Sequence, residues 1–430
     1  MSIGTQTRFW SLPFAFRWLA ICVLAVTVVS GQTLLNDPKK IADAQELFDT
    51  MHSGQLPCEI TPRKPHFIFS LRMQAGYVAH VPLADFRVQG QKWIVLTRVT
   101  SKERNGNPVY LSDVVELPRG GNSQHEAMVQ GSYWLGEGRY SVDFLMFDDA
   151  GDVCRKEWEV DARLNSGVRN VKPILPPGAV AGNSVNELPV PAAKPVGRVT
   201  ILLHAASLLQ RQSSLRDLDK AMFLDAMVAL MEEMPARPVR LVVFNLEQQR
   251  ELSRKDGFTL DDLPEVSREL DAIRPSAVDY SVLRSPAGPV DRIRNLVNQE
   301  LHAPEPSDAV IFLGPRSIYK DKPSPPFGLP PTAKPKFFYL LWEQPPVGSG
   351  LRFGPGLQGQ VGRMGGTDPF AGTMHGDVNS PAIINSGPNH GPDSIAYTVD
   401  QLKGKTIKVD SVESFASAVA EIARLSGMNQ

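Results

Sequence analysis

One uninterrupted run of strand-forming residues limits the folds open to this chain more than any other feature. The segment Val199–Leu203 (VTILL) contains only β-branched and aliphatic residues. A strand with one solvated face alternates apolar and polar residues, so a continuous run is typical of a strand that is covered on both faces. Such a strand needs parallel neighbours and helices on each side. We therefore predict that Val199–Leu203 is the central strand of an α/β domain.

Strand and helix patterns alternate after this segment. Further strands are predicted at Val239–Asn245, Ala309–Gly314, Phe337–Trp342 and Thr406–Val409. Helical spacing places Leu218, Met222, Ala226 and Leu230 on one face of a first helix, and Phe415, Ala418, Val419, Ile422 and Leu425 on one face of a last helix. This order predicts a doubly wound α/β domain with a mostly parallel sheet over residues 198–427.

The charge balance excludes some classes of partner. The chain of 430 residues has 45 Lys and Arg against 46 Asp and Glu, so it has no basic field that would attract nucleic acid or an anionic membrane surface. Its 36 prolines are more than average, and six of them fall in residues 166–197 among Gly, Ala and Asn. We predict that residues 166–197 form an extended linker in front of the α/β domain.

The N-terminus has the features of a signal peptide over residues 1–31. Arg8 and Arg17 precede the apolar run Trp18–Val29, and the small residues Ser30 and Gly31 follow it. An uncleaved anchor is the alternative, but the run is shorter than the ~20 residues needed to cross a bilayer. The sequence predicts a secreted or periplasmic protein with no stable membrane anchor after cleavage. A lead segment, residues 32–56, follows with a short helix at Ile41–Met51 that we expect to pack on the next domain.

Residues 57–165 change to a period of two, which is typical of strands. Strands are predicted at His66–Leu71, Lys92–Val99, Tyr140–Phe147 and Val153–Val160, and Phe147–Asp152 has the Asp and Gly residues of a hairpin loop. The pattern resembles an immunoglobulin-like β-sandwich.

Two further features support a sandwich. The segment Gly136–Tyr140 resembles the corner motif in which a Tyr hydroxyl binds the preceding turn, although Val142 stands where an immunoglobulin domain has a cysteine. Cys58 and Cys154 are the two cysteines left after signal cleavage, and in an oxidising compartment we predict that they form a disulfide. Two separate buried thiols are the alternative.

The α/β domain resembles the von Willebrand factor type A family, and the resemblance covers Arg198 to about Leu425. It rests on an edge hairpin formed by the strand Arg240–Asn245 and the short polar strand Gln249–Ser253, on a helix start at Thr259 with Asp262 three residues later, and on the strand Asp308–Gly314. A sandwich followed by such a domain is also similar to secreted bacterial members of this family. The resemblance implies a ligand face at the carboxyl ends of the parallel strands.

The usual metal site of that family is degenerate here. The resemblance implies Asp-x-Ser-x-Ser after the first strand, whereas this chain has His204-Ala205-Ala206-Ser207-Leu208. After the fourth strand an Asp is expected, and the chain has Gly314-Pro315-Arg316-Ser317. Asp279 and Ser281 could lie near the second loop, but a hard cation needs about six oxygen ligands. We predict no metal and no cofactor. Candidate binding residues in the crevice are His204, Ser207, Asp279, Arg316 and Ser317.

A Gly-rich insertion at residues 348–392 interrupts the domain. Its segment Gly354–Gly359 matches the Gly-x-Gly-x-x-Gly motif of dinucleotide-binding proteins. The strand–turn–helix context of that motif is missing, so we interpret the match as chance. His375, Asp377, His390 and Asp393 could bind a metal, but their spacing matches no known site, and a mobile loop is the preferred interpretation.

These observations predict a non-catalytic protein-binding or scaffold protein whose partner is another protein. The alternative is an extracytoplasmic hydrolase that uses the crevice near His204. The chain has no Gly-x-Ser-x-Gly elbow, P-loop or His-Glu-x-x-His motif, so no nucleophile is paired with a base by sequence.

Overall fold

The fold was analysed in a computed structural model. It describes residues 32–428 except for 53, 55, 83–91, 104–105, 117–125, 150, 165–170, 184–196, 209–214, 235, 274–287, 320–334 and 344–392. The predicted signal peptide and the Gly-rich insertion therefore lie outside the described residues. None of the helices in the described ranges is long and apolar enough to cross a membrane.

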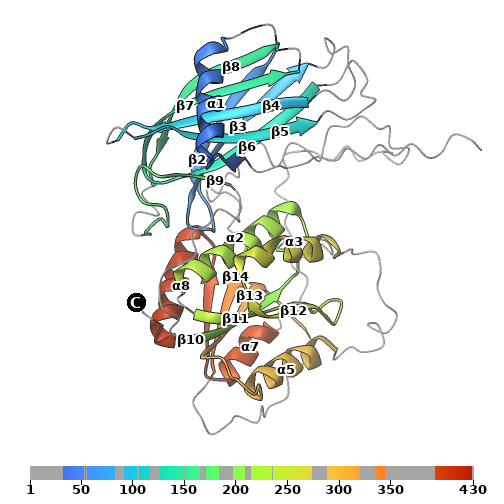
Figure 1. Cartoon of the computed structure of the whole chain (residues 1–430). Helices are drawn as coiled ribbons and strands as arrows, with labels where there is room; N and C mark the ends of the chain where they lie inside the picture. The colour runs from blue at the N-terminus through green and yellow to red at the C-terminus, as the bar shows by residue number, and fades with distance from the viewer. Residues whose placement is uncertain are drawn as a thin grey trace, which may run out of the picture. The chain divides into compact units, whose positions relative to one another are not determined.

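Two antiparallel sheets form the N-terminal part of the fold (Figure 1). The first has the order β1-β5-β4-β7-β8, with β1 (Thr33–Leu34), β4 (Lys92–Ser101), β5 (Val109–Glu116), β7 (Gly138–Asp148) and β8 (Val153–Ala162). The second has the order β2-β3-β6-β9, with β2 (Glu59–Phe67), β3 (Met73–Pro82), β6 (Glu126–Leu135) and β9 (Val180–Gly182). Trp93 and Phe144 of the first sheet share a buried core with Tyr77 and Val129 of the second. We call this two-sheet part the sandwich.

Helix α1 (Pro38–Thr50) covers part of the outer face of the first sheet, as predicted for the lead segment. Asp37 accepts a hydrogen bond from the backbone of Lys39 and so caps the helix start. Phe48 is 1% exposed and packs with Leu96 and Leu145 of the sheet. Burial of such an apolar stripe stabilises a helix that is too short to be stable alone.

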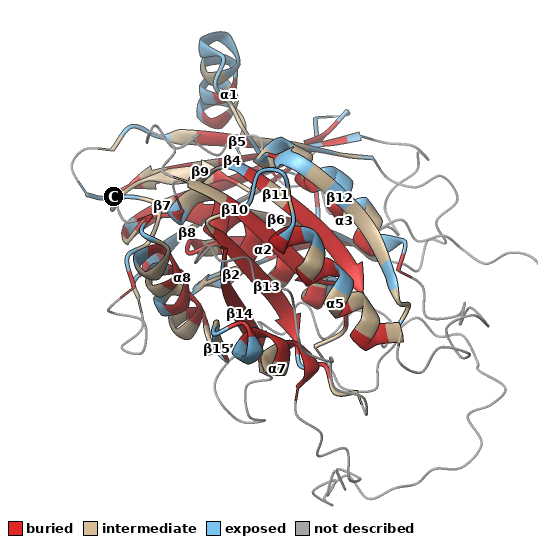
Figure 2. Ribbon diagram, turned by 90° about the horizontal axis from the view of Figure 1, so that it is seen from below, coloured by how far each residue is buried: buried red, intermediate tan, exposed pale blue. Residues whose placement is uncertain are grey.

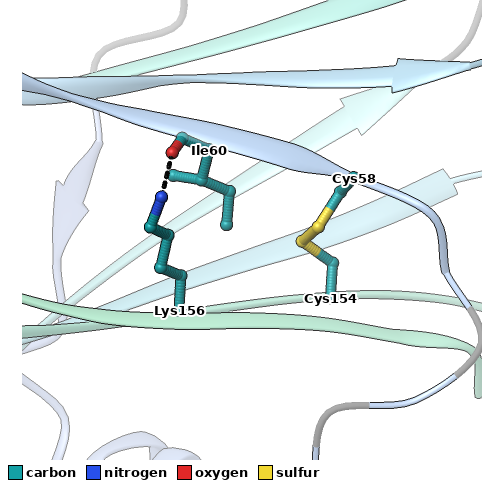
Figure 3. Close-up of a disulfide and its surroundings, with 4 residues drawn as sticks. All are labelled: Cys58, Ile60, Cys154 and Lys156. Atoms are coloured by element: carbon teal, nitrogen blue, oxygen red, sulfur yellow. Dashed lines mark hydrogen bonds between the residues drawn. A yellow bond between two sulfur atoms is a disulfide. The ribbon is translucent and has the colours of Figure 1, made fainter.

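The predicted disulfide is present. Cys58, which precedes β2, is bonded to Cys154 on β8, and their Cα atoms are 6.1 Å apart. Figure 3 shows that the bond joins the two sheets, and that the Lys156 ammonium donates a hydrogen bond of 2.5 Å to the Ile60 carbonyl between the same strands. The edges of the two sheets are therefore held together covalently and by a polar contact.

The predicted tyrosine corner is also present. The Tyr140 hydroxyl lies 2.8 Å from the Gly136 carbonyl oxygen and 3.1 Å from that of Ala179. Ala179 precedes β9, a short strand that pairs antiparallel with β6. Part of the segment predicted as a linker is thus a strand of the sandwich. Periodicity could not reveal it, because three residues are too few to show a period.

Replacing Tyr140 by phenylalanine should lower the free energy of unfolding by about 1–2 kcal/mol, because a buried hydrogen bond is lost and a carbonyl is left unpaired. Burial raises the pKa of Tyr140 to about 12, so the hydroxyl is a protonated donor at neutral pH. Urea unfolding monitored by tryptophan fluorescence measures the change. An unchanged midpoint would mean that the corner contributes nothing to stability.

A six-stranded sheet with helices on both faces forms the C-terminal part. Its order is β12-β11-β10-β13-β14-β15, with β10 (Gly197–His204), β11 (Ala236–Asn245), β12 (Arg250–Phe258), β13 (Ala309–Pro315), β14 (Lys336–Trp342) and β15 (Lys405–Val409). Side chains of α2 (Asp217–Glu233), α3 (Leu263–Asp271) and α8 (Val412–Ser426) pack on one face, and those of α5 (Gly288–Leu301) and α7 (Ser394–Gln401) on the other. Figure 2 shows the central strands as buried. The parallel neighbours predicted for the central run are confirmed as β11 and β13.

The predicted fold class is nevertheless wrong for this chain. Strands account for 44% of the residues that the structure describes, and helices for 30%. Eight of the twelve strand pairings among the described residues are antiparallel. The protein is mostly β, with two antiparallel sheets and one mixed sheet, and is not a doubly wound parallel fold of the von Willebrand type A kind.

Local chain geometry explains part of this correction. The turn Leu246–Gln249 between β11 and β12 is tight, with Gln249 at φ 50°. So short a connection cannot carry a crossover, and β12 must therefore run antiparallel to β11. The sandwich also supplies nine of the fifteen described strands, so antiparallel pairing outweighs the parallel strands around β10.

The turn between β2 and β3 packs into the core that lies under α2 and α8. Phe69 and Leu71 belong to the same buried cluster as Phe223 and Phe415. Arg72 forms an ion pair of 2.6 Å with Glu232 of α2. Asp225, two turns before Glu232 on α2, is partly buried, and this burial raises the pKa of its carboxyl to about 7 although the Arg72 charge lowers it.

Stability should therefore fall as the pH rises through 7. Folded Asp225 keeps its proton up to about pH 7, whereas the unfolded carboxyl loses it near pH 4, so this stabilising contribution is complete below pH 4 and lost above pH 7. The parent protein should lose this contribution between pH 5.5 and pH 8.5, whereas the Asp225→Asn variant has no such carboxyl to titrate. The free energy of unfolding of the variant, measured relative to that of the parent, should therefore rise by about 2 kcal/mol between these two pH values. Urea titrations of both proteins at the two pH values measure this gain. Parallel pH profiles would contradict it.

Candidate functional site

The carboxyl ends of the parallel strands bring together residues that are far apart in the sequence. His204 is the last residue of β10, and Ser317 follows β13 by two residues. Asp393 directly precedes α7. Because parallel strands end at the same edge of a sheet, these loops meet there. We call the edge after β10 and β13 the carboxyl edge.

His204 and Ser317 are in direct contact. The Ser317 hydroxyl lies 3.2 Å from His204 Nδ1, and the two residues are 4% and 2% exposed, respectively. The imidazole stacks on Phe244 with ring centroids 5.3 Å apart. Burial lowers the pKa of His204 to about 4, although a hydrogen bond with the Pro315 backbone raises it. The imidazole is therefore neutral at physiological pH.

Asp393 fastens the Ser317 loop to the start of α7. Its carboxylate accepts hydrogen bonds from the backbone amides of Ser317, Ile395 and Ala396 at 3.0, 2.9 and 2.9 Å. The Tyr339 hydroxyl lies 3.3 Å away, and burial raises the pKa of Asp393 while these hydrogen bonds lower it. A carboxylate at this position both caps the start of α7 and binds the loop that carries Ser317.

Ser207 lies in a separate polar group. Its hydroxyl donates to Asp219 of α2 at 3.3 Å, and Asp219 is fully buried. Arg216 binds the same carboxylate through its guanidinium at 2.6 Å and through its backbone amide at 3.1 Å. Asp219, which contacts the first loop through Ser207, is thus already paired with a cation.

The structure brings together only some of the predicted site residues. His204 and Ser317 touch, Ser207 binds Asp219, and Arg316 is exposed. Asp279 lies outside the described residues. The described ranges contain no group of three or more His, Cys, Asp or Glu that could hold a metal.

Sequence reasoning missed the roles of Asp219, Tyr339 and Asp393. Asp393 was considered only as a metal ligand, yet it immediately precedes α7, and Asp before a helix is a common N-cap. Asp219 lies at the third position of α2, where its carboxylate accepts hydrogen bonds from the Arg216 backbone amide and guanidinium. Tyr339 has no local signal, because it is one aromatic residue within an apolar strand.

The arrangement does not match a catalytic triad. A nucleophilic serine must be reached by substrate, and its histidine must be oriented by a carboxylate on the other ring nitrogen. Ser317 is buried and contacts Nδ1, while His204 Nε2 has no partner among the described residues. Asp393 binds backbone amides of the same loop instead of the imidazole. The cluster joins the loops to one another.

No family model and no curated protein matches the chain. Among solved structures, the ApaA protein of Bordetella pertussis is 10% identical, with 27% of this chain and 99% of that chain covered and a TM-score of 0.17. A lipoprotein from Bacteroides thetaiotaomicron is 12% identical, with 29% and 93% covered and a TM-score of 0.16. A glycosyl hydrolase family 2 member from Bacteroides cellulosilyticus is 10% identical, with 67% and 40% covered and a TM-score of 0.19. At these scores the likenesses carry no argument about the function of this chain.

Proposed function

We propose that this chain is an exported, non-catalytic protein-binding or scaffold protein that uses its carboxyl edge without a divalent metal. The observation that carries the proposal is that Asp219 and Asp393, the two carboxylates described above beside the loops after β10 and β13, already have partners. Asp219 is paired with Arg216, and Asp393 is occupied by backbone amides. A hard cation needs several free oxygen ligands, and neither carboxylate is free to supply them.

The charge left at the edge favours an acidic partner group. Arg316 is exposed directly after β13, and the Arg216 side chain is 35% exposed although it binds Asp219. A guanidinium is well suited to bind a carboxylate or a backbone carbonyl of a partner protein. The disulfide supports export, because such bonds persist mainly in oxidising compartments.

The hydrolase alternative is not part of this proposal. Ser317 is 4% exposed, and its hydroxyl is used to contact His204 and the backbone of its own loop. A nucleophile in this position would require the whole loop to open before it could reach a substrate.

The proposal is tested by a pull-down from envelope extract with the protein beginning at Gln32, followed by affinity measurements on each retained protein. We expect the affinity to be the same in EDTA and in millimolar magnesium. Arg316→Glu should weaken binding at least tenfold, because a repulsive charge replaces the guanidinium. Arg424→Glu is the matched control, since Arg424 is 62% exposed on α8, away from the carboxyl edge.

Two results would contradict the proposal. One is a complex that EDTA dissociates, that magnesium restores and that His204→Ala abolishes, because this would reveal a metal site. The other is equal binding by the Arg316→Glu and Arg424→Glu variants, which would place the binding surface elsewhere.

A further inference from the structure

The turn between β2 and β3 is buried, which is unusual for a hairpin turn. Phe69 and Leu71 are 5% and 3% exposed, and Ser70 and Arg72 are completely buried. The turn is covered by residues of the C-terminal part and not by its own sandwich alone. It therefore inserts into a socket, which we define as Phe223, Glu232, Trp342 and Phe415.

One half of the contact is aromatic. The Phe69 ring centroid lies 4.8 Å from that of Trp342 and 5.7 Å from that of Phe415. Trp342 ends β14, Phe415 lies on α8, and Phe223 of α2 is 5.6 Å from Trp342. The rings of Trp342 and Phe415 thus contact Phe69, and Phe223 of α2 packs against Trp342. Such aromatic pairs contribute through their ring geometry as well as through the area they bury.

The other half is ionic. Arg72 donates to Glu232 at 2.6 Å, and its guanidinium carbon lies 4.8 Å from the ring centroid of Trp134 on β6. One end of this contact is in the sandwich and the other on α2. A buried charge pair tolerates little displacement, because each charge left without its partner is strongly unfavourable.

The backbone of the turn is shaped for insertion. Leu71 has φ 54°, a left-handed conformation that is costly for a branched side chain. The Leu71 amide donates to the Ile68 carbonyl at 2.9 Å, and the Ile174 amide donates to the Leu71 carbonyl at 3.0 Å. Both hydrogen bonds hold the turn in the form that presents Phe69 and Arg72 to the socket.

We propose that the Phe69–Arg72 turn is a latch that holds the sandwich on the α2 and α8 face of the six-stranded sheet, and that its release lets the two parts separate while each stays folded. Each part has a core of its own to support this. The sandwich encloses Trp93 and Phe144, and the α5 face of the sheet encloses Phe312 and Leu296. The latch does not depend on the proposed function.

The latch is tested with Phe69→Asp, which places a charge among the aromatic rings of the socket. Calorimetry should show two separate unfolding transitions in the variant and one in the parent protein. In hydrogen exchange, the amides of Leu71 and Ile174 should exchange at least 100-fold faster, whereas those of β4 and β13 keep the parent rates. Val114→Asp is the control, because Val114 is 55% exposed on the same sandwich.

A single transition at lower temperature, with β4 and β13 amides accelerated together with Leu71, would overturn the latch, because the turn would then be an ordinary part of one core. If Phe69→Asp does not fold, Glu232→Gln decides the question, since it weakens only the ionic half. We expect the amides of Leu71 and Ile174 to exchange about tenfold faster, and the amides of β4 and β13 to keep the exchange rates of the parent protein. Equal acceleration everywhere, or none at Leu71, would reject the proposal.

Discussion

Replacing Cys58 and Cys154 together by alanine should lower the free energy of unfolding by about 4–5 kcal/mol. The bond joins residues separated by 96 positions, and closing so long a loop removes much of the conformational entropy of the unfolded chain. Cys154 is buried in the sandwich core, and alanine is too small to fill the space of its side chain, so lost packing contributes to the decrease in stability. Guanidinium unfolding at neutral pH gives the difference.

Reduction of the parent protein is the matched control for this prediction. The reduced protein keeps both side chains and lacks only the bond, so it should unfold at nearly the same denaturant concentration as the double variant. If reduced and oxidised proteins unfold at the same concentration, the bond does not contribute as the loop-closure argument requires.

Arg72→Ala should destabilise the protein by about 3–5 kcal/mol, because it leaves Glu232 buried without its partner. The Glu232 side chain is 6% exposed and the Arg72 side chain is fully buried. The change also removes the guanidinium from the face of Trp134. Removing both charges in Arg72→Met with Glu232→Leu should restore most of the loss, because apolar groups of similar volume have no desolvation cost.

An exposed ion pair in the sandwich is the control. Lys92 and Glu116 are 2.9 Å apart, with side chains 57% and 67% exposed. Lys92→Ala should cost far less stability than Arg72→Ala, because solvent screens an exposed pair. Similar losses for Arg72→Ala and Lys92→Ala, measured by urea unfolding, would show that burial does not strengthen the Arg72 contact.

Much of the local structure could be predicted from the sequence. The runs at Val199–Leu203 and Ala309–Gly314 lie within strands, and the apolar stripe that includes Phe415 and Ile422 lies within α8. These predictions succeed because periodicity reflects which faces of an element are covered, and this is a property of neighbouring residues. The cysteine pair could be predicted for a different reason: only Cys58 and Cys154 lie outside the predicted signal peptide.

The candidate site could be predicted only in part. His204 and Ser317 were placed near each other because parallel strands end at one edge, although 113 positions separate them. The use of Asp393 to close the Ser317 loop required knowledge of side-chain direction, which element order does not provide. Glu300 is a similar case: a charged residue on a helix is expected to face solvent, yet it is fully buried and binds Thr200, Arg240 and Arg254.

The amino-acid sequence by itself determined where the central strands and main helices lie, because these follow from short-range patterns of apolar residues. It also determined which two cysteines pair, because only two remain after the predicted signal cleavage. Only the tertiary structure decided that the chain is mostly β and that the Phe69–Arg72 turn is buried. The reason is physical: the partner that makes a polar side chain favourable inside the fold can be 160 positions away, as Glu232 is from Arg72, and no local pattern encodes such a contact.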